Sequence, residues 1–115
     1  MSVVIYHNPR CAKSRETLKL LEDRGIHPQI VEYLKTPPAE AILTDILKKL
    51  NKTPRDLIRR QETPYQELGL DNPELSDQEL MHALSANPIL LQRPIVTANG
   101  QAAIGRPPEA VLSIL

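Results

Sequence analysis

Apolar and polar positions predict two strands and a helix in the first third of the chain. Short apolar runs over residues 3–7 and 29–33 are typical of strands. Between them, Leu18 and Leu21 recur at helical spacing over residues 14–24. A helix that connects two neighbouring strands forms a βαβ unit, so we expect these two strands to be parallel.

The middle of the chain has the period of helices. After Thr36-Pro37-Pro38, the apolar residues follow the 3.6-residue period closely. They are Ala39, Ile42, Leu43, Ile46, Leu47 and Leu50. Further helix starts are predicted at Thr53-Pro54, at Thr63 and at Ser76. The last two have capping-box spacing, because a glutamine or glutamate follows each of them three residues later.

A hairpin and a final helix complete the pattern. Residues 94–97 and 101–104 are typical of strands, and Asn99-Gly100 between them is typical of a type I′ turn. Pro107-Pro108 then begins a last helix. The order of elements predicts an α/β, thioredoxin-like (glutaredoxin-like) fold, with a helical insertion between the N-terminal βαβ and the C-terminal ββα. We expect residues 1–115 to form a single domain.

Charge and hydropathy exclude several classes of partner. The 14 basic and 14 acidic residues cancel, so no global field exists to hold nucleic acid or an anionic membrane. No apolar run is long enough to span a bilayer, and the N-terminus lacks the basic and apolar regions of a signal peptide. We therefore expect a cytoplasmic protein with no nucleic-acid partner and no membrane partner.

The chemistry of the chain centres on its single cysteine, Cys11. This thiol follows the first strand and precedes the first helix, where the helix N-terminus stabilises an anion. Arg10, Lys13 and Arg15 add positive charge nearby, which favours a reactive thiolate over a small buried core residue. One cysteine forms no internal disulfide, in keeping with a reducing compartment.

Spacing removes several other chemistries. A phosphatase-type C-x5-R loop would need arginine where Thr17 stands, and a redox CxxC would need cysteine where Ser14 stands. His7, His27 and His82 are far apart in sequence, so we expect no metal site. His7 lies four residues before the thiol, where two interpretations stay open: it tunes the thiolate, or it is an ordinary residue at a strand end.

Two arginines stand before prolines near the end of the chain. In thioredoxin-like folds a cis-proline faces the cysteine, and the fold analogy predicts that Arg93-Pro94 has this role. A following proline restricts the backbone to extended conformations, so Arg93 and Arg106 are both fixed points from which a side chain projects.

Four motifs in this order resemble the glutaredoxin-coupled arsenate reductases, the ArsC family. They are residues 6–15 (YHNPRCAKSR), residues 64–70 (PYQELGL), residues 87–96 (NPILLQRPIV) and residues 104–109 (IGRPPE), with Arg59 between the first two. The HNPRCxKSR form is similar to a chromosomal branch of this family. The resemblance runs essentially from end to end of the chain.

The resemblance implies specific roles for these residues. Cys11 is the nucleophile toward arsenate, His7 lowers the pKa of its thiol, and the oxyanion is held by Arg59, Arg93 and Arg106. The supporting residues are Asn8, Ser14, Arg15 and Pro94. Without the family comparison, the sequence does not distinguish Arg59 from Arg60 as the ligand.

The resemblance also implies that no cofactor is tightly bound, that glutathione is a co-substrate and that glutaredoxin is a partner. Two alternatives stay open. One is a non-catalytic regulator or interaction module of the same superfamily, in which some members bind RNA polymerase. The other is a glutathione-linked thiol oxidoreductase with another substrate.

Overall fold

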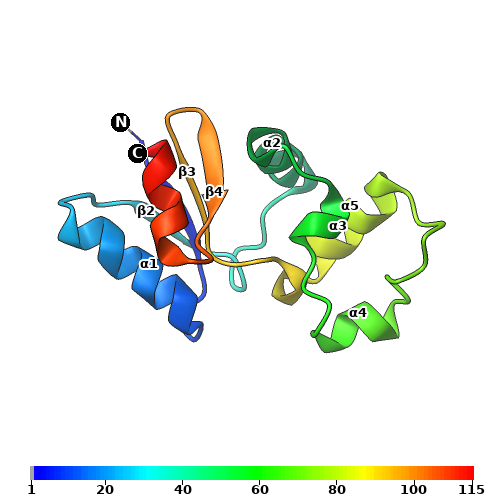
Figure 1. The fold of residues 1–115 in the computed structure, drawn as a ribbon. Helices are drawn as coiled ribbons and strands as arrows, with labels where there is room; N and C mark the ends of the chain where they lie inside the picture. Colours follow the sequence, from blue (N-terminus) through cyan, green and yellow to red (C-terminus); the bar gives the residue numbers. More distant parts are fainter. Residues whose placement is uncertain (1) are drawn as a thin grey trace. The chain divides into compact units, whose positions relative to one another are not determined.

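The predicted strands form one four-stranded sheet with the order β2-β1-β3-β4 (Figure 1). β1 (Val4–His7) pairs in parallel with β2 (Gln29–Glu32) and antiparallel with β3 (Ile95–Ala98), which in turn pairs antiparallel with β4 (Gln101–Ile104). The structure is a computed structural model and describes residues 2–115. This topology confirms the predicted βαβ and ββα units of a thioredoxin-like fold.

Two helices cover one face of this sheet and complete its core. They are α1 (Ala12–Asp23) and η2 (Pro108–Ile114), of which η2 is a 3-10 helix. The core cluster draws on the strands and on both helices, and it consists of Val3, Ile5, Leu21, Val96, Ala98, Val111 and Ile114. Burial of this cluster fixes α1, and with it the residue that precedes α1, against the sheet.

The helix α1 begins earlier than its apolar spacing predicts. The sequence predicts a helix from residue 14, whereas α1 begins at Ala12, with Cys11 as the N-cap residue in extended conformation. The first turn of α1 contains Lys13 and no acidic residue, so it lacks the charge pattern that normally marks a helix start. The cysteine is therefore closer to the helix than the apolar pattern indicates.

The hairpin turn has the predicted geometry. Asn99 has a φ of 54° and Gly100 a φ of 70°, and positive values at both central residues are those of a type I′ turn. The Asn99 side chain also donates a hydrogen bond from Nδ2 to the carbonyl oxygen of Ile114 at 2.9 Å. The tip of the hairpin is thus tied to the end of η2.

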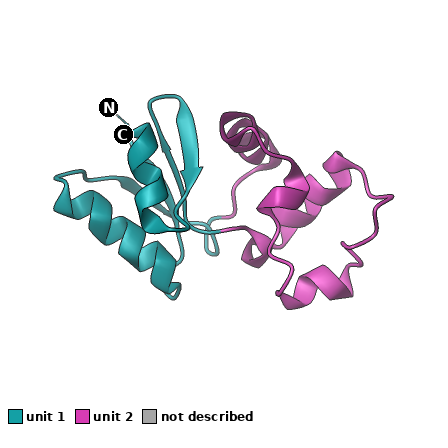
Figure 2. Cartoon of the chain, in the orientation of Figure 1, with its two compact units in different colours: residues 1–36, 93–115 teal, residues 37–92 magenta. Residues whose placement is uncertain are grey.

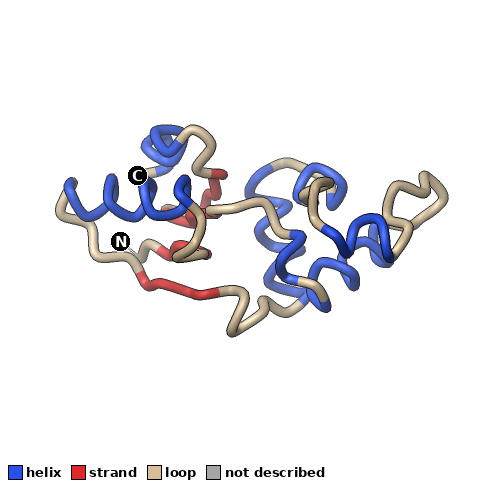
Figure 3. The backbone as a smooth tube through the Cα atoms, turned by 90° about the horizontal axis from the view of Figure 1, so that it is seen from below, coloured by secondary structure: helices blue, strands red, loops and turns tan. Residues whose placement is uncertain are grey.

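The chain divides into two compact units, shown in Figure 2. Unit 1 comprises residues 1–36 and 93–115 and contains the sheet, whereas unit 2 comprises residues 37–92 and is the predicted helical insertion. The strands in Figure 3 all lie in unit 1. A single domain over residues 1–115 stays a prediction.

In the described part of the chain, no helix has the length and apolar character needed to cross a membrane.

Unit 2 is built around one central helix. Its elements are α2 (Glu40–Leu50), α3 (Pro54–Leu57), α4 (Thr63–Glu67), α5 (Asp77–Ala86) and the 3-10 helix η1 (Pro88–Leu90). α5 packs against α2, α3 and η1. The apolar side chains of α2 are not all buried, because Leu43, Ile46 and Leu47 face the interior while Ile42 is 46% exposed.

Of the two capping boxes predicted in unit 2, the structure contains one and lacks the other. Ser76 and Glu79 form the predicted capping box at the start of α5. The capping box predicted at Thr63 is wrong, because α4 starts at Thr63 itself and Glu62 is the N-cap residue. A residue inside the helix no longer has the extended backbone that an N-cap needs. A second capping box occurs at the start of α3, where Asp56 accepts hydrogen bonds from the backbone N–H and the hydroxyl of the N-cap residue Thr53.

Candidate functional site

The single thiol lies at the junction of the first strand and the first helix. The backbone N–H of Cys11 donates to the carbonyl oxygen of Asn8 at 3.0 Å, which closes the turn after β1. The Cys11 carbonyl oxygen accepts the N–H of Arg15 at 3.0 Å, the first hydrogen bond of the α1 ladder. The side chain of Cys11 is half-buried. Cys11 therefore sits at the positive end of the helix dipole, where an anion is stabilised.

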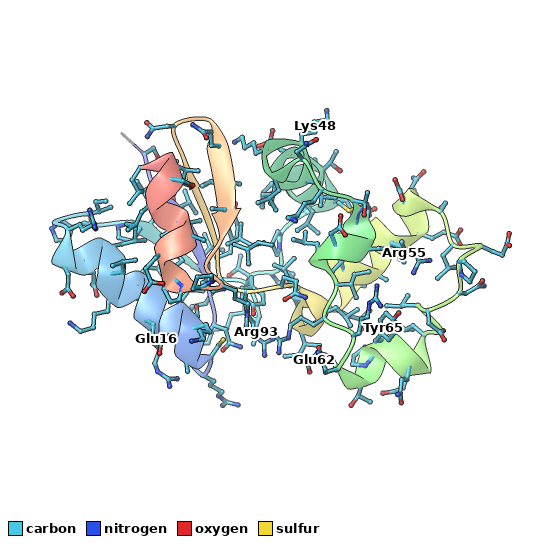
Figure 4. The ribbon with its side chains drawn as sticks, in the orientation of Figure 1. Glu16, Lys48, Arg55, Glu62, Tyr65 and Arg93 are labelled. Atoms are coloured by element: carbon cyan, nitrogen blue, oxygen red, sulfur yellow. The ribbon has the colours of Figure 1, made fainter. Side chains whose placement is uncertain are left out.

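Two arginines from the hairpin approach the Cys11 sulfur. Nη2 of Arg106 lies 3.6 Å from Sγ and donates a hydrogen bond to it. Arg93 also donates a hydrogen bond to the sulfur. Arg93 precedes β3 and Arg106 follows β4, so the two guanidinium groups come from the two sides of the hairpin base (Arg93 is labelled in Figure 4).

The hairpin base holds Arg106 in place. Nε of Arg106 donates to the carbonyl oxygen of Arg93 at 2.7 Å, and the backbone N–H of Gly105 donates to the carbonyl oxygen of Pro94 at 2.9 Å. The Arg93–Pro94 peptide bond is cis, which confirms the prediction, and the Arg106–Pro107 bond is also cis. Both arginines thus lie on a backbone that is bonded across the hairpin.

The surroundings of the sulfur favour the thiolate. Partial burial opposes ionisation and raises the pKa of the Cys11 thiol. The backbone N–H of Ser14, the hydrogen bond from Arg93 and the positive charges of Arg106 and Arg93 outweigh this effect. The pKa of Cys11 is therefore lower than that of an ordinary cysteine, as a helix N-terminus with basic neighbours predicts.

A buried polar network lies beneath the thiol. The hydroxyl of Ser14 is 2.6 Å from Nδ1 of His7 and accepts the backbone N–H of Asn8 at 3.0 Å. All three residues are buried, and Ser14 is completely so. Burial is the main cause of a lowered pKa for His7, and Arg15 lowers that pKa further, although Glu32 opposes the shift. Burial thus disfavours the charged form of His7, whose ring contacts the Ser14 hydroxyl, and the expected role of His7 in lowering the pKa of the thiol stays a prediction.

Arg15 lies at the edge of this network. Its Nη1 donates to the carbonyl oxygen of Pro9 at 3.0 Å, so the exposed side chain braces the loop that leads to Cys11. Within the same loop, the backbone N–H of Arg10 donates to Oδ1 of Asn8 at 3.0 Å. The supporting residues expected from the sequence are thus close to one another, and their functional roles stay predictions.

Two residues next to this cluster are not among those expected from the sequence. Tyr33 follows β2 and is completely buried; its burial raises the pKa of its hydroxyl, while the nearby Arg93 and Asn8 oppose the rise. Gly105 is needed for space, because a Cβ there would lie 2.5 Å from Oγ1 of Thr17. Tyr33 shares the carboxyl-end edge of the sheet with the cysteine loop, a position that a strand assignment alone could have indicated.

The third predicted oxyanion ligand lies in unit 2. The backbone N–H of Arg59 donates to the carbonyl oxygen of Leu90 at 2.7 Å, and its Nε forms an ion pair with Oε1 of Glu62 at 3.3 Å (Glu62 is labelled in Figure 4). The Arg59 side chain is 18% exposed, whereas Arg60 is exposed. Arg59 is therefore the more fixed of the two neighbours, and its role as a ligand stays a prediction.

The cluster in unit 1 places two guanidinium groups beside a thiol whose pKa is lowered. A thiolate is the reactive form of cysteine, and two guanidinium groups beside it bind and neutralise a small oxyanion. Among the described residues, no group of three or more histidine, cysteine, aspartate or glutamate side chains is arranged to hold a metal ion. The site is thus suited to nucleophilic attack by sulfur on the centre of an oxyanion.

Comparisons with known proteins agree with this chemistry. The model of the ArsC family matches residues 6–114. The chain is 54% identical over 114 residues to the uncharacterized protein YfgD of Escherichia coli, covering 98% of this chain and 96% of that protein. It is 50% identical over 116 residues to the arsenate reductase of Haemophilus influenzae, covering both chains completely. The solved arsenate reductase of Vibrio cholerae superposes with a TM-score of 0.97 at 52% identity, covering 100% of this chain and 98% of the other.

Proposed function

The chain belongs to the ArsC family, and from this we infer that it is an arsenate reductase that takes its electrons from glutathione and glutaredoxin. The observation that carries this proposal is the approach of Arg93 and Arg106 to the sulfur of Cys11. A nucleophile held between two guanidinium groups is suited to a substrate that is itself a small anion.

The two arginines offset the electrostatic repulsion between the thiolate and its anionic substrate. Arsenate is a doubly negative tetrahedral oxyanion near neutral pH, and the Cys11 thiolate that must approach it is also negative. Guanidinium groups offset this repulsion, stay ionised throughout and donate parallel hydrogen bonds to neighbouring oxygens. Arg93 and Arg106 therefore have two roles in this proposal: they stabilise the thiolate before arsenate arrives, and they hold the oxyanion afterwards.

The first chemical step is attack by Cys11 on arsenic. The thiolate forms an S–As bond, and an oxygen of arsenate leaves as hydroxide or, once protonated, as water. The hydrogen bond from the Ser14 backbone and the charge of Arg106 keep Cys11 ionised for this attack. The arginines then stabilise the negative oxygens that remain on arsenic.

The later steps need thiols from outside the chain. Glutathione condenses with the arsenic adduct, with loss of a second oxygen as water, so that arsenic is bonded to both Cys11 and glutathione. A glutaredoxin thiolate then attacks the glutathione sulfur and forms a mixed disulfide with it. The bond between that sulfur and arsenic breaks, and its electron pair stays on arsenic. Arsenic becomes trivalent, and water displaces Cys11 to release arsenite. The chain has one cysteine, which agrees with this need for external thiols.

A coupled assay tests the proposal. Purified protein is mixed with glutathione, glutaredoxin and glutathione reductase, and oxidation of NADPH is followed with and without arsenate. We expect oxidation that depends on arsenate and that disappears when Cys11→Ser replaces the nucleophile, since serine is similar in size and is not ionised near neutral pH. Absence of turnover by the unchanged protein, or turnover by the serine variant, contradicts the proposal.

A further inference from the structure

A cavity beside the cysteine loop has no role in the reaction described so far. Its volume is about 260 Å³, and it is lined by residues 7–10 together with Glu32, Leu34 and Lys35. It lies at the carboxyl ends of the parallel strands β1 and β2, which is where open α/β sheets commonly bind ligands. Arg10 in its wall immediately precedes Cys11 in the sequence, so the cavity lies beside the loop that leads to this thiol.

The charges on the cavity wall are of both signs. Arg10 is exposed and has no ion-pair partner within residues 2–115. Nζ of Lys35 lies 3.6 Å from Oε1 of Glu32, and both side chains are open to solvent. A free amino-acid group, with one ammonium and one carboxylate on the same carbon, complements a wall that offers both a carboxylate and two cations.

The size of the cavity limits what it can bind. Sites for small molecules usually enclose about 300 to 1,000 Å³, so this cavity suits one end of a peptide and not a whole tripeptide. Leu34, which is 38% exposed, and Pro9 add an apolar wall for a short methylene chain. The γ-glutamyl end of glutathione has these parts: a free ammonium, a free carboxylate and two methylene groups.

We propose that this cavity binds the γ-glutamyl end of glutathione, with Glu32 binding its ammonium and Arg10 and Lys35 binding its carboxylate. The cysteinyl part of the tripeptide then extends along the loop toward Cys11. This inference rests on the proposed function, which makes glutathione the second thiol. The cavity gives that thiol a position of its own, separate from the arginines that hold the oxyanion.

Exchange of a mixed disulfide tests the cavity without any arsenate. Cys11 is first converted to its disulfide with thionitrobenzoate, and a small thiol is then added. The added thiolate attacks the Cys11 sulfur and forms a new S–S bond with it, and thionitrobenzoate leaves with the electron pair as a coloured thiolate. The rate of colour release, divided by the concentration of added thiolate, measures how well each thiol is positioned at Cys11.

Three probes separate recognition from charge. Glutathione and γ-glutamylcysteine carry the γ-glutamyl end, whereas N-acetylcysteinylglycine has the same net charge as glutathione and lacks that end. We expect the first two to react about fivefold faster than the third at low concentration, with saturation at high concentration. Equal rates for the three thiolates overturn the proposal.

Matched variants locate the effect. Arg10→Ala and Lys35→Ala should each remove most of the advantage of glutathione over N-acetylcysteinylglycine. Lys19→Ala is the control, because Lys19 is an exposed lysine of unit 1 that pairs with Asp23 at 3.1 Å away from this cavity, and it should keep the advantage. An advantage that persists in Arg10→Ala and Lys35→Ala overturns the proposed site.

The outcome is independent of arsenate reduction. A protein that prefers glutathione in the exchange reaction but does not reduce arsenate contradicts the proposed function and leaves the cavity assignment standing. A protein that reduces arsenate but shows no preference among the three thiols contradicts the cavity assignment alone.

Discussion

Arg106 and Arg93 are joined by a hydrogen bond from the side chain of one to the main chain of the other. Nε of Arg106 donates to the Arg93 carbonyl oxygen at 2.7 Å, while Nη2 of the same guanidinium lies 3.6 Å from the Cys11 sulfur. A planar group held at two of its nitrogens has a fixed orientation. A lysine side chain in this position could supply charge but could not make both contacts in one plane.

The first prediction concerns this geometry. Replacing Arg93 or Arg106 by lysine should weaken the binding of arsenate or sulfate about tenfold, because one charge-assisted hydrogen bond of the pair is lost. Isothermal titration measures the affinity, and Arg24→Lys, at the exposed end of α1, is a control that should bind normally. Unchanged affinity in both site variants would show that charge alone suffices.

The second prediction concerns pH. Because the folded protein lowers the pKa of Cys11, the reactive thiolate should form at a lower pH than in a free cysteine, whose pKa is about 8.5. The rate of alkylation by iodoacetamide should therefore rise with pH and level off early. Arg106→Ala removes a positive charge from the sulfur and should move the midpoint upward. A midpoint at or above the ordinary value in the unchanged protein would contradict this expectation.

The third prediction concerns the buried network. Ser14→Ala should lower the free energy of unfolding by about 1 to 3 kcal/mol, since Nδ1 of His7 and the N–H of Asn8 lose a buried partner. Urea denaturation measures the change. Ser113→Ala is the matched control, because its exposed hydroxyl donates only to the Ala110 carbonyl oxygen, and it should change stability by less than about 0.5 kcal/mol. Equal effects of the two substitutions would rule out a special role for Ser14.

The fourth prediction concerns the electron donor. A chain with one cysteine has no second thiol to release arsenic from Cys11, so glutathione should be obligatory. Mass spectrometry after treatment with arsenate and glutathione, without glutaredoxin, should find arsenic on Cys11 with glutathione bonded to that arsenic. Activity should vanish when glutathione is omitted, even in the presence of thioredoxin and its reductase. Full turnover with thioredoxin alone would exclude the proposed route.

Local signals in the sequence were sufficient for most of the fold. Asn99-Gly100 specified the hairpin turn because both residues tolerate positive φ, and the position of the prolines marked the helix starts. The errors came from shifts of one or two residues at helix starts. Thr63 has the spacing of a cap, but α4 includes it, and the choice between Glu62 and Thr63 as the N-cap depends on how the surrounding chain packs.

The candidate site was less accessible to the sequence, because its parts come from different elements. The motif around Cys11 predicted the location of the thiol, but the contact of Ser14 with His7 exists only once α1 has folded against β1. The proximity of Arg93 to Arg106 likewise depends on the closed hairpin. The strand assignment places Tyr33 at the same sheet edge as the cysteine loop, but its proximity to Arg93 depends on the folded hairpin base.

The hairpin has a consequence for the insertions and deletions that this protein can accept. Arg93 and Arg106 flank the pair Ile95 and Ile104 at the open end, so added residues at the tip leave the two arginines opposite each other. Strand side chains alternate faces, so one residue added within a single strand turns its later side chains to the other face, whereas residues added in the turn leave the register of the strands unchanged. Natural length variation at this hairpin should therefore be confined to its tip.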